Sequence, residues 1–218
     1  LAIECGATRL CLADTVGHAT PHGVRQLVRF IRHDVIAPTG SDVKLDWHGH
    51  RDRGFGLANT FAAIEEGVDR VHGTALGIGE RVGNTEMDLL LVNMKLLGLH
   101  DRDLSKLPHY VEAVSRATGV PVPPSYPVFG RDAFRTGTGV HAAAIIKAQQ
   151  KGDDWLVDRV YSGIPAAEFG LQQIIEISHV SGMSNVKHWL AAHGYDAADD
   201  GLCRHVCELA KQTSRVLS

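Results

Sequence analysis

The sequence predicts an α/β fold, with a parallel sheet in its first half and mainly helices in its second. Short apolar runs alternate with helical patterns three times before residue 98, and helical patterns dominate afterwards. The composition, 44% hydrophobic and 22% charged over 218 residues, is ordinary for one or two domains. Because parallel strands need crossover connections, this alternation predicts right-handed βαβ units.

The first strand–helix unit begins with the apolar run at residues 9–13. Thr20 is the expected helix cap, and Pro21 suits the first helical position, where no amide hydrogen is needed. The apolar residues that follow have the i, i+3, i+4, i+7 spacing of one buried stripe. They are Val24, Leu27, Val28, Ile31 and Val35.

The second and third units repeat this order. A strand is expected at 43–47, followed by HGHRDRG and an Ala-rich helix that ends at Gly67, and another strand at 68–72, followed by a glycine-rich loop and a helix at 85–98. In parallel sheets, open or closed, active groups collect at the carboxyl ends of the strands. Those ends are polar or glycine-rich here: Asp14-Thr15, His48-Gly49-His50 and 77–84.

The pattern changes after residue 98. A helix is expected at 106–117, and the proline-rich PVPPSYPVFG at 121–130 is typical of a stiff spacer. The remaining helices are expected at 139–151, 165–180, 186–192 and 202–217.

The net charge and the length of the apolar runs argue against nucleic-acid binding and a membrane-spanning helix. The formal net charge is −3, so the chain has no basic excess for nucleic acid. The longest apolar runs span a few residues, far fewer than the roughly 20 of a membrane-spanning helix. Four scattered cysteines without a CxxC motif, and a start unlike a secretory signal, predict a soluble cytoplasmic protein.

His48 and His50 lie two apart at a strand end, where the period of two puts both side chains on one face. Two imidazoles in this position can share one metal ion, and Asp46 and Asp52 continue the alternation. A pair of ordinary loop histidines is the alternative interpretation.

The segment GIGERVGN at 77–84 lacks the dinucleotide-binding fingerprint, because Val82 stands where the third glycine belongs. It instead presents Glu80, Arg81 and Asn84 before a helix. The structural alternative is a tight turn with a solvated Glu–Arg pair.

His141 follows two glycines at the start of a helix, where the helix dipole lowers an imidazole pKa and favours a general base. Tyr161, in VYSGIPAAEFG, is a second candidate for proton transfer. Each residue, taken alone, is equally compatible with a structural role.

Together, several segments closely resemble the 2-isopropylmalate synthase branch of the metal-dependent acyl-CoA condensing enzymes. These segments are DTVGHATP, the stretch 44–98, AFRTGTGVHAAAI and SHVSGMSN. The wider group contains homocitrate synthase, citramalate synthase and, more distantly, hydroxymethylglutaryl-CoA lyase. The resemblance covers nearly the whole chain and is most specific at 44–98.

The resemblance implies roles for seven residues. It makes His48, His50 and Asn84 metal ligands, Glu80 and His141 an acid–base pair assisted by Tyr161, and Thr15 the contact for the carboxylate of an oxo acid. Two positions depart from the family pattern: Arg51 replaces the usual Asn of HxHND, and Thr138 replaces the usual Ser before Gly-aliphatic-His.

The fold implied by the resemblance is the C-terminal half of a (β/α)8 TIM barrel, followed by a mainly helical subdomain. We expect half of the barrel at 1–100, a linker at 101–130 and, at 131–218, a helical subdomain that contributes to the active site. The family's metal-binding Asp and its neighbouring Arg precede the matched region. A half barrel would leave two open edges and an uncovered apolar interior, so the chain is a fragment or one half of a split enzyme.

The implied reaction is a Claisen condensation of acetyl-CoA with 2-oxoisovalerate that gives 2-isopropylmalate, a transferase step of leucine biosynthesis. It would use Mn²⁺, Mg²⁺ or Zn²⁺. Homocitrate or citramalate synthesis from another 2-oxo acid remains open, and so does a partner-dependent half without activity of its own. An aldol-type lyase should lack the segment that carries His141. The expected partner is a second copy in a homodimer, or a complementary N-terminal half chain.

Overall fold

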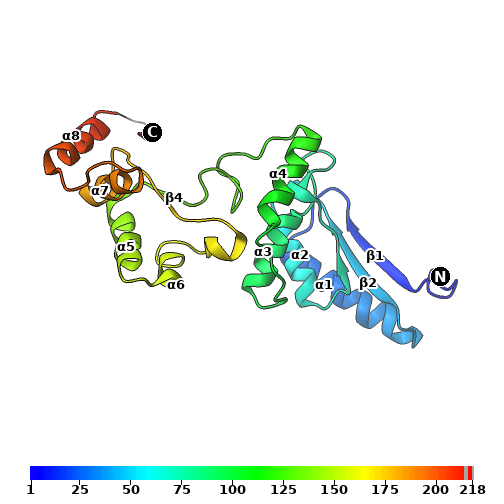
Figure 1. Ribbon diagram of the computed structural model, residues 1–218. Helices are drawn as coiled ribbons and strands as arrows, with labels where there is room; N and C mark the ends of the chain where they lie inside the picture. Colours follow the sequence, from blue (N-terminus) through cyan, green and yellow to red (C-terminus); the bar gives the residue numbers. More distant parts are fainter. Residues whose placement is uncertain (214–215, 218) are drawn as a thin grey trace. The chain divides into compact units, whose positions relative to one another are not determined.

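The computed structural model describes residues 1–213 and 216–217. It divides into two compact units, Leu1–Asp101 and Arg102–Ser218, which are described separately below. Figure 1 shows their helices and strands in chain order.

The first unit is built on a three-stranded parallel sheet of order β1-β2-β3. Its strands are β1 (Arg9–Asp14), β2 (Lys44–Gly49) and β3 (Arg70–Val71). Helix α1 (Pro21–Phe30) connects the first two strands and α2 (Gly56–Glu65) the second two. The predicted α/β arrangement of this region is confirmed, although β3 is only 2 residues long.

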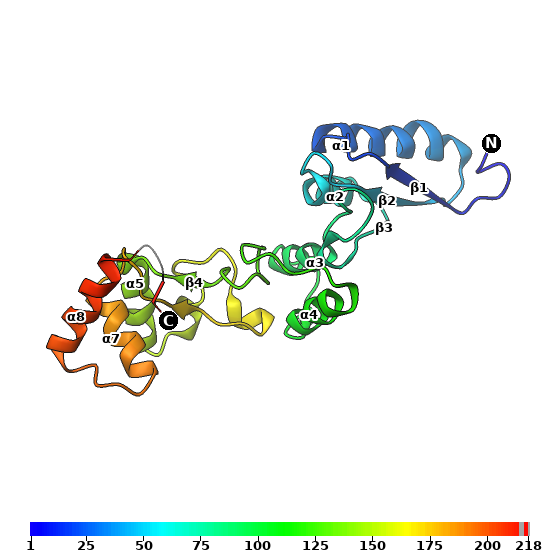
Figure 2. The same ribbon diagram turned by 90° about the horizontal axis from the view of Figure 1, so that it is seen from above.

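The core of this unit lies on one face of the sheet. Leu45 and Trp47 of β2 are 0% and 1% exposed and pack against α1 and α2. The helical side of this core consists of Val24, Val28, Ala62 and Ala63. Figure 2 shows both helices along the same side of the strands. Each large apolar side chain buried in this way contributes about 1.5–3 kcal/mol to stability.

Helix α1 starts where the sequence predicts, because the Gly23 amide donates to Thr20 Oγ1 at 3.2 Å. Its expected buried stripe is partly wrong. Leu27 is 42% exposed, and the chain widens into a π-helix, η1 (Ile31–Ile36). The wider turn changes which side chains face the core, so Ile36 is buried where Val35 was expected. A short 3-10 turn, η2 (Ala37–Thr39), follows.

The other face of the sheet carries charges instead of the apolar surface that we expected. Asp46 has only 2% of its side chain exposed and accepts hydrogen bonds from Arg9 at 2.5 Å and Arg70 at 2.9 Å. Burial alone would raise the pKa of Asp46, but the bonds from Arg70 and Arg9 outweigh it and hold the pKa below its ordinary value. The open face therefore contains an ionic network.

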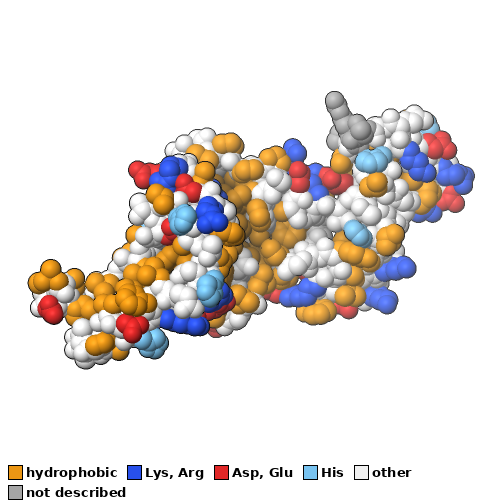
Figure 3. Space-filling model, turned by 180° about the vertical axis from the view of Figure 1, so that it is seen from behind, with side chains coloured by type: hydrophobic (Ala, Val, Ile, Leu, Met, Phe, Trp, Pro, Cys, Tyr) orange, Lys and Arg blue, Asp and Glu red, His pale blue; other side chains and the backbone are white. Residues whose placement is uncertain are grey.

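Ion pairs also join the helices of this unit. Arg25 bonds to Glu65 at 3.0 Å and Arg29 to Glu66 at 2.7 Å, which connects α1 to the end of α2. On the face of the molecule shown in Figure 3, Lys and Arg side chains are interspersed with those of Asp and Glu. The unit is completed by the 3-10 turn η3 (Ala75–Gly77) and by α3 (Met87–Leu96).

The second unit is mainly helical but contains a small parallel sheet. Its elements are α4 (Leu107–Thr118), β4 (Arg135–Thr136), α5 (Gly139–Gln150), α6 (Asp154–Val157), η4 (Ala166–Phe169), β5 (Ile174–Ile175), α7 (Met183–Ala192) and α8 (Asp200–Lys211). Strand β4 pairs with β5. The described part of the chain has no helix with the length and apolar character needed to cross a membrane.

The helix expected at 165–180 is wrong. A 3-10 turn ends at Gly170, which has φ 70° in the left-handed region, and Ile174–Ile175 then pairs with Arg135–Thr136. Helices were rightly expected in the regions of α4, α5, α7 and α8, although α8 ends at Lys211 instead of Leu217.

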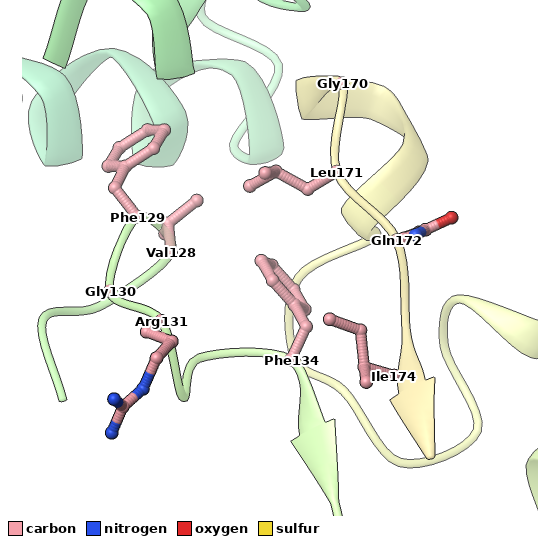
Figure 4. Close-up of a pocket in the computed structure, with 9 residues that line it drawn as sticks. All are labelled: Val128, Phe129, Gly130, Arg131, Phe134, Gly170, Leu171, Gln172 and Ile174. Carbon is pink, nitrogen blue, oxygen red and sulfur yellow. The ribbon is translucent and has the colours of Figure 1, made fainter. Parts of the chain in front are cut away.

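The proline-rich segment 121–130 folds back on itself. The Gly130 amide donates to the Tyr126 carbonyl at 2.9 Å, and Val128 has φ 64°, an unfavourable value for a β-branched residue. Together with Phe134 and Leu171, this segment lines an open pocket of about 440 Å³. In Figure 4 the two phenylalanine rings and Leu171 point into that space.

Candidate active site

Polar residues from two chain segments are held together at the carboxyl end of β2. His50 forms an isolated antiparallel bridge with Asn84, although 34 positions separate them in the chain. On either side of this bridge, the Arg51 amide donates to the Gly83 carbonyl at 3.1 Å and the Thr85 amide to Gly49 at 3.2 Å. The backbone therefore fixes the glycine-rich loop against the strand end.

The rings of His48 and His50 lie 5.4 Å apart between centroids and are nearly perpendicular. His72, just after β3, places its ring 5.6 Å from that of His48. Burial, followed by the proximity of His72 and His50, lowers the pKa of His48. A lowered pKa keeps this imidazole neutral, which is the state that binds metal ions.

His72 was not predicted as a site residue. It is the last residue of the third predicted strand, and His48 directly follows the second, so this similar position was the available signal. In the described residues, no group of three or more His, Cys, Asp or Glu side chains is arranged to hold a metal ion.

Two buried polar atoms near the bridge have no hydrogen-bond partner among the described residues. His50 is 7% exposed and Asn84 is 9% exposed, yet His50 Nδ1 and Asn84 Oδ1 make no hydrogen bond. An unpartnered buried acceptor is costly, because it loses its bonds to water. A cation that accepts both lone pairs would remove that cost, so these donor atoms fit a metal ion, with at least one more ligand from elsewhere.

The two aspartates that alternate with the histidines have other partners. Asp46 belongs to the network with Arg9 and Arg70. Asp52 accepts two bonds from Arg81, at 2.7 and 3.0 Å, and the bond from Arg81 is the main cause of its lowered pKa. Neither carboxylate is therefore free to serve as the third ligand of the histidine pair.

The glycine-rich loop has little freedom to rearrange. A Cβ atom on Gly79 would lie 2.1 Å from Asn84 Nδ2, and one on Gly83 would lie 1.9 Å from the Gly77 carbonyl oxygen. Leu76 and Arg81, at φ 56° and 54°, adopt the left-handed region that non-glycine residues avoid. Backbone strain of this kind is characteristic of functional sites.

Glu80 and Thr15 lie at the solvent-exposed rim of this site. The Glu80 side chain is 85% exposed and lies 3.9 Å from Arg81. Arg81 bonds more closely to Asp52 and donates to the Thr15 carbonyl at 2.7 Å. The alternative of a solvated Glu–Arg turn therefore describes Glu80 but not Arg81, which joins the loop to the end of β1.

His141 and Tyr161 belong to the second unit and are in contact with each other. Their rings stack with centroids 4.1 Å apart and planes 28° apart, and both side chains are exposed. His141 is the third residue of α5, as expected for a helix start. Tyr161 also lines a hollow of about 450 Å³ whose other walls include Pro127 and Phe134.

Comparison with known proteins matches residues 1–114 to the family described as HMGL-like. The chain is 35% identical over 205 residues to a Methanopyrus kandleri protein with the provisional name (R)-citramalate synthase CimA, covering 92% of the chain and 37% of the relative. It is 33% identical over 215 residues to homocitrate synthase AksA of Methanothermobacter thermautotrophicus, covering 96% of the chain and 50% of the relative.

A third relative, provisionally named 2-isopropylmalate synthase, is also from Methanopyrus kandleri. It is 32% identical over 214 residues, which cover 95% of the chain and 40% of the relative. The chain therefore spans half or less of the length of these relatives.

Proposed function

The chain belongs to the HMGL-like family, and from this premise we propose that the full-length protein is an acyltransferase that condenses acetyl-CoA with a 2-oxo acid. The observation that carries the proposal is the pair of buried acceptors without partners, His50 Nδ1 and Asn84 Oδ1, at the carboxyl end of a parallel strand. Catalytic groups of parallel α/β folds gather at such ends.

The sheet of the first unit is proposed to be part of a (β/α)8 barrel, with 1–100 as its C-terminal half, 101–130 as a linker and 131–218 as a helical subdomain. The parallel strand order β1-β2-β3, with helices between consecutive strands, supports this architecture. The charged open face would then line the interior of the barrel.

His48, His50 and Asn84 are proposed to hold a divalent cation, Mn²⁺, Mg²⁺ or Zn²⁺. The lowered pKa of His48 and the free acceptors of the other two support this assignment. The cation would act as a Lewis acid that polarises the keto group of the oxo acid.

The remaining residues handle binding and protons. Thr15, at the end of β1, would bind the carboxylate of the oxo acid through its hydroxyl. His141 would take a methyl proton from acetyl-CoA, the resulting carbanion would form the new bond to the keto carbon, and Glu80 would return a proton to the oxygen. Tyr161 would assist by holding the His141 ring through the observed stacking. Hydrolysis of the thioester then releases CoA.

The substrate that we propose is 2-oxoisovalerate, which makes the reaction a step of leucine biosynthesis. Homocitrate or citramalate synthesis is the alternative, because relatives with all three kinds of name lie between 32% and 35% identity. We further propose that the protein acts in the cytoplasm, as a homodimer or together with a complementary N-terminal half chain.

The test is to supply the full-length protein with Mn²⁺, acetyl-CoA and, in turn, 2-oxoisovalerate, 2-oxoglutarate and pyruvate. Free CoA thiol should appear only with an oxo acid, fastest with 2-oxoisovalerate, and mass spectrometry should identify the hydroxy diacid. The His48→Ala variant provides the background rate. Thiol release with none of the three acids, or cleavage of hydroxymethylglutaryl-CoA instead, would refute the proposal.

A further inference from the structure

Arg51 departs from the family pattern and contacts the glycine-rich loop at three separate points. Its Nε donates to the Val82 carbonyl at 2.7 Å, and its Nη2 lies 3.4 Å from the Leu76 carbonyl. Its Nη1 forms an ion pair with Glu86. The side chain therefore bonds to residues just before, within and just after the glycine-rich loop, up to the start of α3.

Arg51 adds side-chain bonds to the backbone bonds that fix the loop against the strand end. The glycines of the loop offer no side chains for packing, and Leu76 is strained at φ 56°. The ion pair is well shielded, since the Arg51 and Glu86 side chains are only 29% and 14% exposed. Charged hydrogen bonds in such a place are stronger than those on an open surface.

We propose that Arg51 is a positioning residue that holds loop 76–86 against the end of β2 and so keeps Asn84 and Glu80 in place for the reaction. The proposal rests on the proposed function. Arg51 follows His50 directly in the chain, so one residue connects the strand end to the loop that bears the third proposed ligand.

Arginine is needed because its planar guanidinium presents five donors in fixed directions, whereas a lysine ammonium is a single point. The substitution Arg51→Lys would keep the charge opposite Glu86 but would lose the simultaneous contacts with the Val82 and Leu76 carbonyls. It is therefore the informative variant. Arg53→Lys is its matched control, because Arg53 donates to the His18 carbonyl and lies over Phe55.

The experiment measures amide hydrogen exchange and metal affinity in the full-length protein. The Gly83 and Asn84 amides donate within the loop, to the carbonyls of Glu80 and Gly77, both at 2.9 Å. In Arg51→Lys their protection should fall about 10-fold, as expected for the loss of one charged hydrogen bond. Mn²⁺ affinity should fall about 10- to 100-fold, the usual cost of losing a residue that orients a ligand. Arg53→Lys should change neither value.

A second variant guards against misfolding. Glu86→Gln leaves Arg51 intact and weakens one of its three contacts, so it should produce the same changes with a smaller size. The proposal would be overturned if the Gly83 and Asn84 amides were equally protected from hydrogen exchange in Arg51→Lys and Arg53→Lys. A loosened loop with unchanged Mn²⁺ affinity would also overturn it, because Arg51 would then be merely structural.

Failure of the proposed function gives a different result. In that case His48→Ala and His50→Ala would leave Mn²⁺ affinity unchanged, while the exchange measurement would still show whether Arg51 holds the loop.

Discussion

The strand-end cluster of the first unit and the His141–Tyr161 pair of the second are built in opposite ways. His50 and Asn84 are almost completely buried and are joined by a backbone bridge. His141 and Tyr161 are exposed and stack on each other. One site is organised within its own unit, whereas the other presents its side chains to solvent.

Because of this difference, we expect the two units to contribute different functions, metal binding and proton transfer. A cation site needs fixed donor atoms, and under the proposed function the first unit would supply three of them from its own sheet and loop. A general base works best where water is excluded, so the exposed pair would need another surface to cover it if it takes the proposed role. We expect substitutions in the first unit to alter metal binding and those in the second to alter the rate of proton transfer.

The largest expected effect concerns His50→Ala. Loss of a direct ligand should lower the affinity for Mn²⁺ more than the roughly 100-fold that follows loss of an orienting residue, and turnover should stop. Calorimetric titration with Mn²⁺ measures the affinity. His22→Ala, at an exposed position of α1, is the control. Normal metal content in His50→Ala would place the cation elsewhere.

His141→Ala should lower kcat about 100-fold or more, with little change in KM for the oxo acid, because a general base contributes to the chemical step. Steady-state kinetics of thiol release separate the two constants. His193→Ala is the control, since His193 also stacks on an aromatic ring, that of Trp189, at 3.8 Å. A change confined to KM would make His141 a binding residue, and the contrast between the two units would disappear.

Asp46→Asn tests whether the ionic network supports the strand end. The free energy of unfolding should fall by about 1.5–3 kcal/mol at neutral pH, the usual value of a hydrogen bond to a charged group. The pKa of Asp46 is lowered in the folded state. The stabilisation by Asp46 is therefore present when the pH is above its pKa in the unfolded state, which is about 4. It is lost as the pH falls through the lower pKa of the folded state.

Urea unfolding between pH 7 and pH 3 should show this acid-side loss in the wild type and a flatter curve in Asp46→Asn. Asp42→Asn is the control, because the Asp42 side chain is 87% exposed. If the free energy of unfolding depended on pH in the same way in the wild type and in Asp46→Asn, the ionic network would contribute nothing to stability.

The smallest expected effect is a partial recovery of activity. If the exposed pair serves the site of a second copy, inactive full-length His48→Ala and His141→Ala chains should complement each other when mixed. Random dimers would regain about a quarter of the wild-type rate, because half of them form with one intact site each. Verified mixed dimers without any turnover would show that His141 acts within its own chain or not at all.

Local patterns in the sequence were sufficient to predict most elements of the first unit. The Thr20 cap and the apolar run of the second strand depend on neighbouring residues, and both were predicted correctly, although the strand begins at Lys44 instead of Val43. The burial of Ile36 in place of Val35 was missed because the π-helical widening of Ile31–Ile36 leaves no mark in the apolar spacing. In the second unit, β5 was read as part of a helix because its partner β4 lies 39 positions earlier.

The same limit applies to the candidate site. The proximity of His48 and His50 follows from the period of a strand and was predicted. The pairing of Arg81 with Asp52 spans 29 positions and that of Arg51 with Glu86 spans 35, and no local rule connects them. Long-range arginine–carboxylate pairs also hold Asp46 and Asp52, the two aspartates that continue the alternation of the histidines.

The tight packing of the glycine-rich loop has an evolutionary consequence. Gly79 and Gly83 have no space for any side chain, whereas Val82 between them is 51% exposed. Gly83 is blocked by a backbone oxygen, so purifying selection should retain it for steric reasons alone, even in a lineage whose chemistry has decayed. Gly79 is blocked by the Asn84 side chain and should be free to change once Asn84 is lost. A genome survey that recognises active members by Gly83 would therefore include inactive descendants.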